Sequence, residues 1–264
     1  MVSSENPVLP LELERETFEL AAFLYPECML TLVLVAQRVR TWIHPMLFRT
    51  FSIHDGTRTG FSRLSLSTVA KLVKFDPLAL DYTRNVCFNN VNIPGVAADF
   101  IYRCDRIVNL AFIGRIEIQY PEIILEDHPL ERLCFSLTTF KNLFPFPDPF
   151  DGGHALFSCL THLDIMDYRI DGWLTWSGLA QMPRLTHLSS IYASMTAPIV
   201  QGILKHCKRL EVLVFMYDSQ ARLEGAQAAL QLTDDPRFVM LVVEDRLADW
   251  EAGTRGRRRP LGRG

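Results

Sequence analysis

A leucine pattern in the second half of the chain recurs at a fixed interval. Segments of the form Leu-x-x-Leu begin at Leu160, Leu185 and Leu210, so each starts 25 residues after the one before. Intervals of roughly 20–29 residues are typical of repeat proteins in which every unit is a short strand followed by a return segment. One such unit cannot bury its apolar face alone, whereas stacked units bury a continuous core. The pattern therefore predicts a stack of parallel strands.

Weaker copies of the pattern extend the repeat in both directions. These copies begin at Thr83, Ile107, Leu130 and Phe238. The long interval before Leu160 contains a stretch rich in proline and glycine, 144–153, whose composition indicates a loop insertion. An alternating segment that begins at Phe48 is predicted to be the first strand of the stack.

Helical patterns occupy the segments between these strands. Return helices are predicted over 171–181, over 221–232, and after a cap at Thr196 with Pro198 in the first turn. Strands that alternate with helices and are joined by short links favour a parallel sheet. We therefore predict an α/β fold in which an irregular leucine-rich-repeat solenoid with a parallel sheet spans about 48–245.

Residues 5–47 are predicted to form a small helical unit that leads directly into the repeats. Its first helix begins near Pro10, where the missing N–H of proline costs little, and it ends at Pro26. A second helical stretch runs from about Cys28. We expect it to break at His44-Pro45, because proline cannot donate a helical hydrogen bond.

Several short segments carry a resemblance to a known family. In the helical unit these are the entry Leu9-Pro10-Leu11-Glu12-Leu13, then Phe18, and the stretch 32–38. Together they resemble an F-box, the helical module that docks onto a Skp-family adaptor of cullin–RING ubiquitin ligases. The chain is also similar to the F-box-like proteins of mushroom-forming fungi, in the segments 45–49, 235–241 and 249–253.

The resemblance implies a non-catalytic substrate-recognition subunit of an SCF-type ubiquitin ligase, located in the cytoplasm or the nucleus. Its partners would be a Skp-family adaptor with its cullin complex and an unknown protein target, while partner subunits would transfer ubiquitin. The residues implied to bind the adaptor are Leu9, Pro10, Leu13, Phe18, Leu32 and Val35. The alternative is a stand-alone leucine-rich-repeat binding module whose residues 5–47 only cap the open end of the stack.

Residues between the leucine anchors are expected to face one common surface, because side chains alternate along a strand. The predicted target-binding residues on this concave face are Arg132, His162, Asp164, Met166, His187, Val212, Val214 and Met216. His162 and His187 should be neighbours with Asp164 alongside, which raises the question of acid–base or metal chemistry. Spacing places no third ligand, so we predict no metal, no cofactor and no catalytic residue. The apolar end near Val214 is either a partner site or is covered by the C-terminal segment.

Composition argues against other classes of partner. The net charge of −3 provides no general attraction to nucleic acid. The apolar run 29–36 is far short of the ~20 residues of a membrane span, so no membrane partner is expected. Six cysteines form no Cys-x-x-Cys pair. Residues 246–264 are predicted to be a basic, disordered tail with five arginines at its end, Arg255, Arg257, Arg258, Arg259 and Arg263.

Overall fold

The computed structural model describes most of the chain between Leu9 and Thr254. The described residues are 9–54, 63–93, 95–114, 117–118, 128–136, 151–166, 177–191, 197–229 and 234–254. Several sequence predictions therefore fall outside the description. These are the cap at Thr196, the tryptophan-containing part of the predicted helix 171–181, most of the loop insertion, and the five arginines at the end of the chain.

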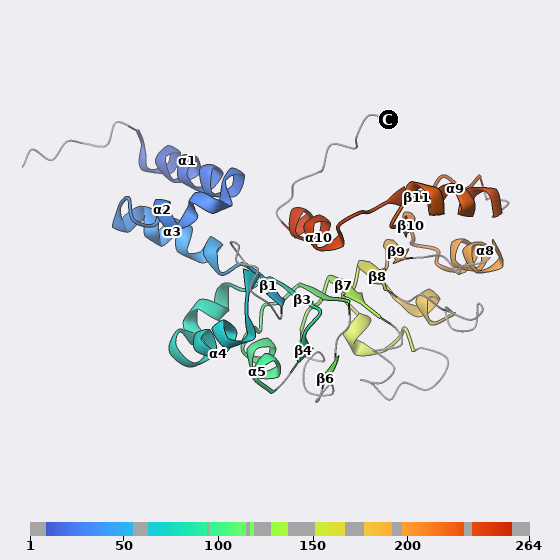
Figure 1. Ribbon diagram of the computed structural model, residues 1–264, viewed down its shortest axis with the longest axis horizontal. Helices are drawn as coiled ribbons and strands as arrows, with labels where there is room; N and C mark the ends of the chain where they lie inside the picture. Colours follow the sequence, from blue (N-terminus) through green and yellow to red (C-terminus); the bar gives the residue numbers. More distant parts are fainter. Residues whose placement is uncertain are drawn as a thin grey trace, which may run out of the picture.

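A single parallel sheet organises the described residues (Figure 1). Its nine strands are β1 (Thr50–His54), β2 (Arg63–Leu64), β3 (Asn85–Asn89), β5 (Asn109–Ile113), β7 (Arg132–Phe135), β8 (His162–Ile165), β9 (His187–Ile191), β10 (Val212–Tyr217) and β11 (Phe238–Val242). Their order is β11-β10-β9-β8-β7-β5-β3-β1-β2, and all neighbouring pairs are parallel. The α/β fold and every strand predicted from the leucine pattern are thus confirmed. The short strand β2 was not predicted.

The return segments lie on the outer side of the curved sheet (Figure 1). They are α4 (Leu66–Phe75), η2 (Pro77–Tyr82), α5 (Gly95–Arg103), η3 (Ala155–Phe157), η4 (Ser177–Gln181), α8 (Ala197–His206) and α9 (Gln220–Ala229), where η marks a 3-10 turn. A second, two-stranded parallel sheet pairs β4 (Asn92–Ile93) with β6 (Glu117–Ile118). The main apolar core fills the space between the sheet and these segments as one continuous cluster.

The leucine anchors form a column inside this core. Leu163 pairs in register with Leu188, and Leu188 pairs with Leu213. All three side chains are almost fully buried. Because the three positions recur every 25 residues, one apolar slot of each unit packs on the same slot of the next.

A repeated pair of backbone hydrogen bonds marks the entrance of six strands, β3, β5, β7, β8, β9 and β10. The carbonyl of Thr161, for example, accepts the N–H groups of both Thr186 and His187 from the next unit. The carbonyls that accept two such bonds are those of Arg49, Arg84, Val108, Glu131, Thr161 and Thr186. The units from β3 to β10 therefore begin at the same height as their neighbours, which aligns the register of these strands.

Two units also share a left-handed turn directly after the strand. Asn90 has φ 49° after β3, and Gly114 has φ 78° at the equivalent place after β5. Asn90 packs so tightly on Gly114 that a Cβ at residue 114 would lie 2.1 Å from the Asn90 Oδ1. Glycine is therefore required at 114 both by its backbone angle and by its neighbour.

The N-terminal unit consists of α1 (Leu11–Leu24), η1 (Pro26–Cys28), α2 (Met29–Leu32) and α3 (Gln37–Leu47). These helices have their own small core, built around Ala22, Met29, Val39 and Ile43. Arg38 ties α3 to α1 through a two-pronged contact with the Glu14 carboxylate at 2.8–3.0 Å.

The predicted break at His44-Pro45 is wrong, because α3 continues through Pro45 to Leu47. The missing N–H of Pro45 removes one helical hydrogen bond, to the carbonyl of Thr41, and Thr41 is an exposed residue. The break in the second helical stretch occurs earlier, at Ala36, whose extended backbone (φ −159°, ψ 156°) separates α2 from α3.

The boundary predicted at residue 245 also needs correction. Residues 246–254, assigned from sequence to a disordered tail, form helix α10 (Arg246–Thr254) on the inner side of the sheet (Figure 1). The Asp245 side chain accepts the N–H of Ala248 at 3.0 Å and so caps the helix. The arginine-rich composition of residues after Thr254 obscured this short helical segment.

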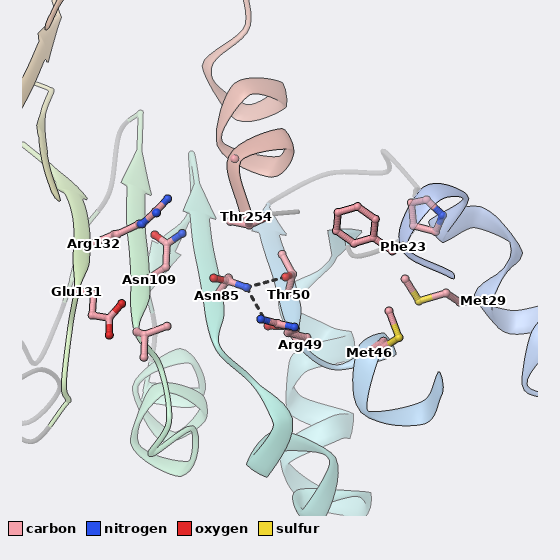
Figure 2. Close-up of a pocket in the computed structure, with 13 residues that line it drawn as sticks. Phe23, Met29, Met46, Arg49, Thr50, Asn85, Asn109, Glu131, Arg132 and Thr254 are labelled. Atoms are coloured by element: carbon pink, nitrogen blue, oxygen red, sulfur yellow. Dashed lines mark hydrogen bonds between the residues drawn. The ribbon is translucent and has the colours of Figure 1, made fainter. Parts of the chain in front are cut away.

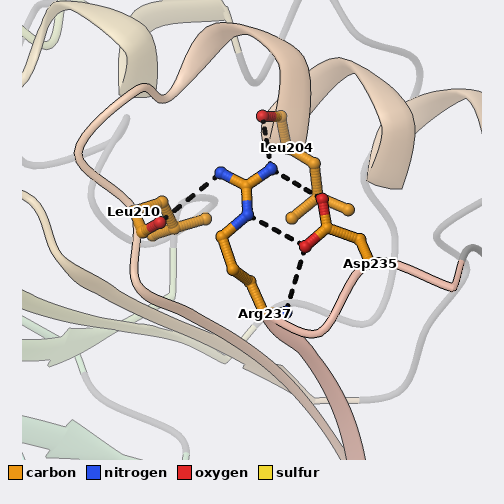
Figure 3. Close-up of polar contacts among 4 residues, drawn as sticks. All are labelled: Leu204, Leu210, Asp235 and Arg237. Carbon is orange, nitrogen blue, oxygen red and sulfur yellow. Dashed lines mark hydrogen bonds and ion pairs between the residues drawn. The ribbon is translucent and has the colours of Figure 1, made fainter.

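An arginine locks the last strand to the unit before it (Figure 3). Arg237 donates to the carbonyl of Leu204 near the end of α8 at 2.9 Å and to that of Leu210 at 3.5 Å. The same guanidinium pairs with Asp235 at 2.7 Å. The hydrogen bonds that Asp235 accepts from the Arg237 side chain and backbone N–H lower the pKa of Asp235 to about 2.

We predict that Leu188→Ala lowers the free energy of unfolding by about 2–5 kcal/mol, because it opens a cavity in the leucine column. Chemical denaturation measures this change. The control Glu211→Ala, at an exposed position next to β10, should shift it by no more than about 0.5 kcal/mol. A loss under about 1 kcal/mol for Leu188→Ala would contradict the packed column.

We also predict an acid-dependent contribution from Asp235. A carboxyl group whose folded pKa is depressed stabilises the fold above its unfolded pKa, and this stabilisation disappears as the pH falls from 3.8 to about 2. Thermal melts over this window should show a smaller loss of stability in Asp235→Asn than in the unmodified protein. Equal losses in the two proteins would contradict the assignment.

Candidate functional site

The inner, concave face of the sheet divides into a covered part and an open part. On β8, β9 and β10 the residues that face this surface are partly exposed, except for the buried Ile191 at the end of β9, and they alternate with buried core residues. On β3 and β5 most of the equivalent residues are buried, including Asn85 at 7% and Asn109 at 8% exposure, whereas Asn89 at the end of β3 is partly exposed. Helix α10 lies over this second group and accounts for its burial.

Apolar contacts seat α10 on the middle of the sheet. Leu247 and Trp250 pack against a small cluster separate from the main core, made of Cys87, Ala111, Ile113 and Cys134, with Met166 at its edge. The indole N–H of Trp250 donates to the Asn109 Oδ1 at 3.3 Å. The C-terminal segment therefore covers the centre of the concave face, while Val212 and Val214 at its apolar end stay partly exposed.

Polar contacts extend the reach of α10 towards both ends of the sheet. Arg246 forms an ion pair with Asp164 on β8 and places its other nitrogen 3.1 Å from the Met216 sulfur on β10. Glu251 pairs with Arg63 on β2 at 3.1 Å. Two predicted target-binding residues, Asp164 and Met216, are thus in contact with the protein's own C-terminal helix, and Met166 packs on the same apolar cluster as that helix.

His162 and His187 lie side by side, as their spacing predicts. Their strands place them in register, and their rings stack with centroids 4.2 Å apart at an angle of 8°. The Thr161 hydroxyl donates to the Glu131 carbonyl at 3.0 Å and lies 2.8 Å from Nδ1 of His162.

The same arrangement recurs one unit later. Thr186 donates to the Thr161 carbonyl at 3.1 Å, and its hydroxyl lies 2.8 Å from Nδ1 of His187. Each imidazole is thus held at Nδ1 by the hydroxyl of the threonine that precedes it. The repeated Leu-Thr-His-Leu sequence thus places two stacked imidazoles on the open part of the face.

The chemistry of this group does not support an acid–base relay. Asp164, the third member of the predicted cluster, accepts a hydrogen bond from Ser189 at 2.7 Å and pairs with Arg246. Both of its oxygens are therefore bonded to groups other than the imidazoles. Within the described residues, no group of three or more His, Cys, Asp or Glu side chains is arranged to hold a metal ion.

Two cavities border the end of α10, and both are lined by Gly253 and Thr254. The first has a volume of about 300 Å³ and lies on the open part of the concave face. Its polar lining includes Arg132, His162 and His187, and Val214 and Trp250 supply apolar wall. Five of the eight predicted target-binding residues line this cavity, namely Arg132, His162, Asp164, His187 and Val214.

The second cavity, of about 390 Å³, lies between the N-terminal helices and the sheet (Figure 2). One wall is apolar and comes from the helical unit: Phe23, Pro26, Met29 and Met46. The opposite wall is polar and includes Thr50, Asn85, Asn109 and Arg132. The Asn85 side chain donates to the Thr50 hydroxyl at 2.9 Å. Sequence reasoning missed this site, because its walls come from segments distant along the chain.

The N-terminal helices carry a third surface, which is apolar. Of the residues implied to bind the adaptor, Leu9, Leu13 and Val35 are exposed by 46%, 49% and 58%. Pro10 is also exposed, whereas Phe18 and Leu32 are partly buried against the unit's own core. The sequence patterns did not single out Leu30 and Leu34, which are more exposed still.

The cysteines are free thiols, all six of them within the described residues. Burial raises the pKa of Cys104 to about 12 and that of Cys207 to about 11. On the concave face, burial likewise raises the pKa of Cys87 and Cys134. These four thiols stay protonated near neutral pH and are poor nucleophiles.

A scan of protein-family models finds no match to this chain, and a search of curated protein sequences finds none either. The structure itself shows a pattern: N-terminal helices followed by a long parallel sheet of repeated strand-and-return units, consistent with a leucine-rich-repeat arrangement. Among the described helices, none combines the length and the apolar character needed to cross a bilayer.

We predict that His162 titrates near pH 4 rather than at its usual 6.5, which histidine NMR measures directly. Burial lowers the pKa most, followed by the charge of Arg132 and by His187. The unfolded chain then binds more protons than the folded one, so His162 makes the fold less stable as the pH falls from 6.5 to about 4. A midpoint near 6.5 in the folded protein would contradict this burial.

Proposed function

We propose that the protein is a substrate-recognition subunit of a cullin–RING ubiquitin ligase. In this role the N-terminal helices dock onto a Skp-family adaptor, and the concave face of the repeat sheet binds a target protein. The chain itself performs no catalysis, and ubiquitin transfer belongs to partner subunits. The F-box resemblance of residues 9–38 suggests the adaptor, and the repeat architecture suggests the target surface.

The observation that carries the proposal is the distribution of unburied apolar side chains. Among the described residues, fifteen large apolar side chains are exposed, and ten of them lie between Leu9 and Val35. The ten are Leu9, Leu11, Leu13, Leu20, Phe23, Leu24, Tyr25, Leu30, Leu34 and Val35. Exposed apolar surface at this density is typical of protein interaction sites.

A purely capping role explains this surface poorly. The terminal units that cap repeat arrays present a polar outer face to solvent. Here the outer faces of α1 and α2 are rich in leucine, and the contact with the repeats runs mainly through α3 and η2. His44 and Phe48 form part of that junction, with ring centroids 4.9 Å apart. If the protein is a stand-alone repeat module whose N-terminal helices only cap the stack, the exposed leucine-rich face of α1 and α2 has no binding partner.

We predict that the double variant Leu9→Ala, Leu13→Ala recovers far less Skp-family adaptor than the unmodified protein. Losing two half-exposed leucine contacts costs roughly 2 kcal/mol of binding, or about a thirtyfold change in affinity. Titration of purified adaptor measures this change. The thermal melt should stay almost the same, because neither leucine belongs to a buried core.

Phe75→Ala with Leu78→Ala is the matched control. These side chains are exposed by 72% and 73% on α4 and η2, outside the helical unit. The control should bind adaptor as well as the unmodified protein. If the unmodified protein binds no adaptor, or if both double variants bind it equally, the adaptor-docking proposal fails.

A further inference from the structure

The surface beneath α10 is the most completely built interaction site on the concave face. It supplies an acceptor for an indole N–H at Asn109, a carboxylate for a guanidinium at Asp164, and an apolar floor around Ala111. Helix α10 uses all three with Trp250, Arg246 and Leu247. The protein's own helix therefore reveals which side chains this surface accepts.

We propose that α10 is an internal ligand that occupies the target site, and that the target presents a helix of the same chemistry. The target helix carries an arginine and, one turn later, a tryptophan, with an apolar residue following the arginine. Positions i, i+1 and i+4 of a helix lie within a common face, so one target helix can present all three side chains. The inference rests on the concave face as the target-binding surface, and it is independent of the adaptor.

The length of α10 favours displacement. The helix has nine residues, fewer than the roughly 12–15 at which isolated helices become even marginally stable in water. Its structure therefore depends on the sheet beneath it. None of its residues is fully buried, and cavities border its C-terminal end, so it is held by a few specific contacts.

The place of α10 in the chain makes it an effective competitor. Only residues 243–245 separate it from β11, which is a paired strand of the sheet. A short tether of this kind gives the helix a millimolar effective concentration at its site. A target in solution must overcome this concentration, so weakening α10 should strengthen target binding.

The experiment uses a fluorescent peptide of residues 244–254 as the probe and the full chain as the receptor. The variant Arg246→Ala, Trp250→Ala keeps the acceptor surface intact and removes the two main anchors of the tethered helix. We expect this variant to bind the peptide at least about tenfold more tightly than the unmodified protein, as measured by fluorescence anisotropy. The peptide with its tryptophan replaced by alanine should bind neither protein.

Two further variants serve as controls for position. Tyr102→Ala with Lys205→Ala removes an aromatic ring and a cation from exposed positions on α5 and α8, and it should behave as the unmodified protein. Adding Asp164→Ala to the Arg246→Ala, Trp250→Ala variant should abolish the gain, because the peptide loses its carboxylate partner. Equal peptide binding to all proteins, or none to any, would overturn the proposal.

Hydrogen exchange on the unmodified protein tests whether α10 can leave the sheet, and it does so even if the variants fold poorly. A displaceable α10 opens without global unfolding, so its amides should exchange at least about a hundredfold faster than those of β9. Equal protection of α10 and β9 would make α10 a fixed part of the fold and overturn the proposal. Adaptor binding by Arg246→Ala, Trp250→Ala should be unchanged, so a failed adaptor interaction would be recognised separately.

Discussion

The in-register packing of one leucine slot on the next is the interaction on which the rest of this structure depends. Leu163, Leu188 and Leu213 form a buried column, and the doubly accepting carbonyls at the strand entrances from β3 to β10 align the units. Parallel strands stacked in this way leave one side of the sheet without return segments. That side is the concave face, so the same packing that stabilises the fold also creates a long surface available for binding.

The N-terminal and the C-terminal helices are placed differently relative to this concave face. The N-terminal helices form their own small core and lead into β1 through α3, with much of their apolar surface turned to solvent. The C-terminal helix turns back over the sheet and bridges strands from β2 to β10 with Glu251, Trp250 and Arg246. The exposed apolar surface of residues 9–35 and the concave face of the sheet therefore lie on either side of the cavity of Figure 2.

Sequence reasoning succeeded where the signal was local and repeated. The 25-residue interval predicted the strands, their parallel pairing and the contact between His162 and His187. It failed where tertiary contacts decide the outcome. Nothing in the periodicity indicates that Trp250 reaches Asn109, 141 positions earlier, or that Arg246 reaches Asp164. A signal was present, since Arg246, Leu247 and Trp250 lie on one helical face after a capping Asp245, but the arginine-rich end of the chain masked it.

The proposed receptor role joins the two surfaces, one for an adaptor and one for a target. Its most direct test is photo-crosslinking from a benzoylphenylalanine placed at position 34, where Leu34 is 82% exposed, compared with position 75, where Phe75 is 72% exposed. After capture from cells, the account predicts that a Skp-family adaptor is crosslinked from position 34 and not from position 75. Crosslinked products from position 34 that contain no adaptor would contradict it.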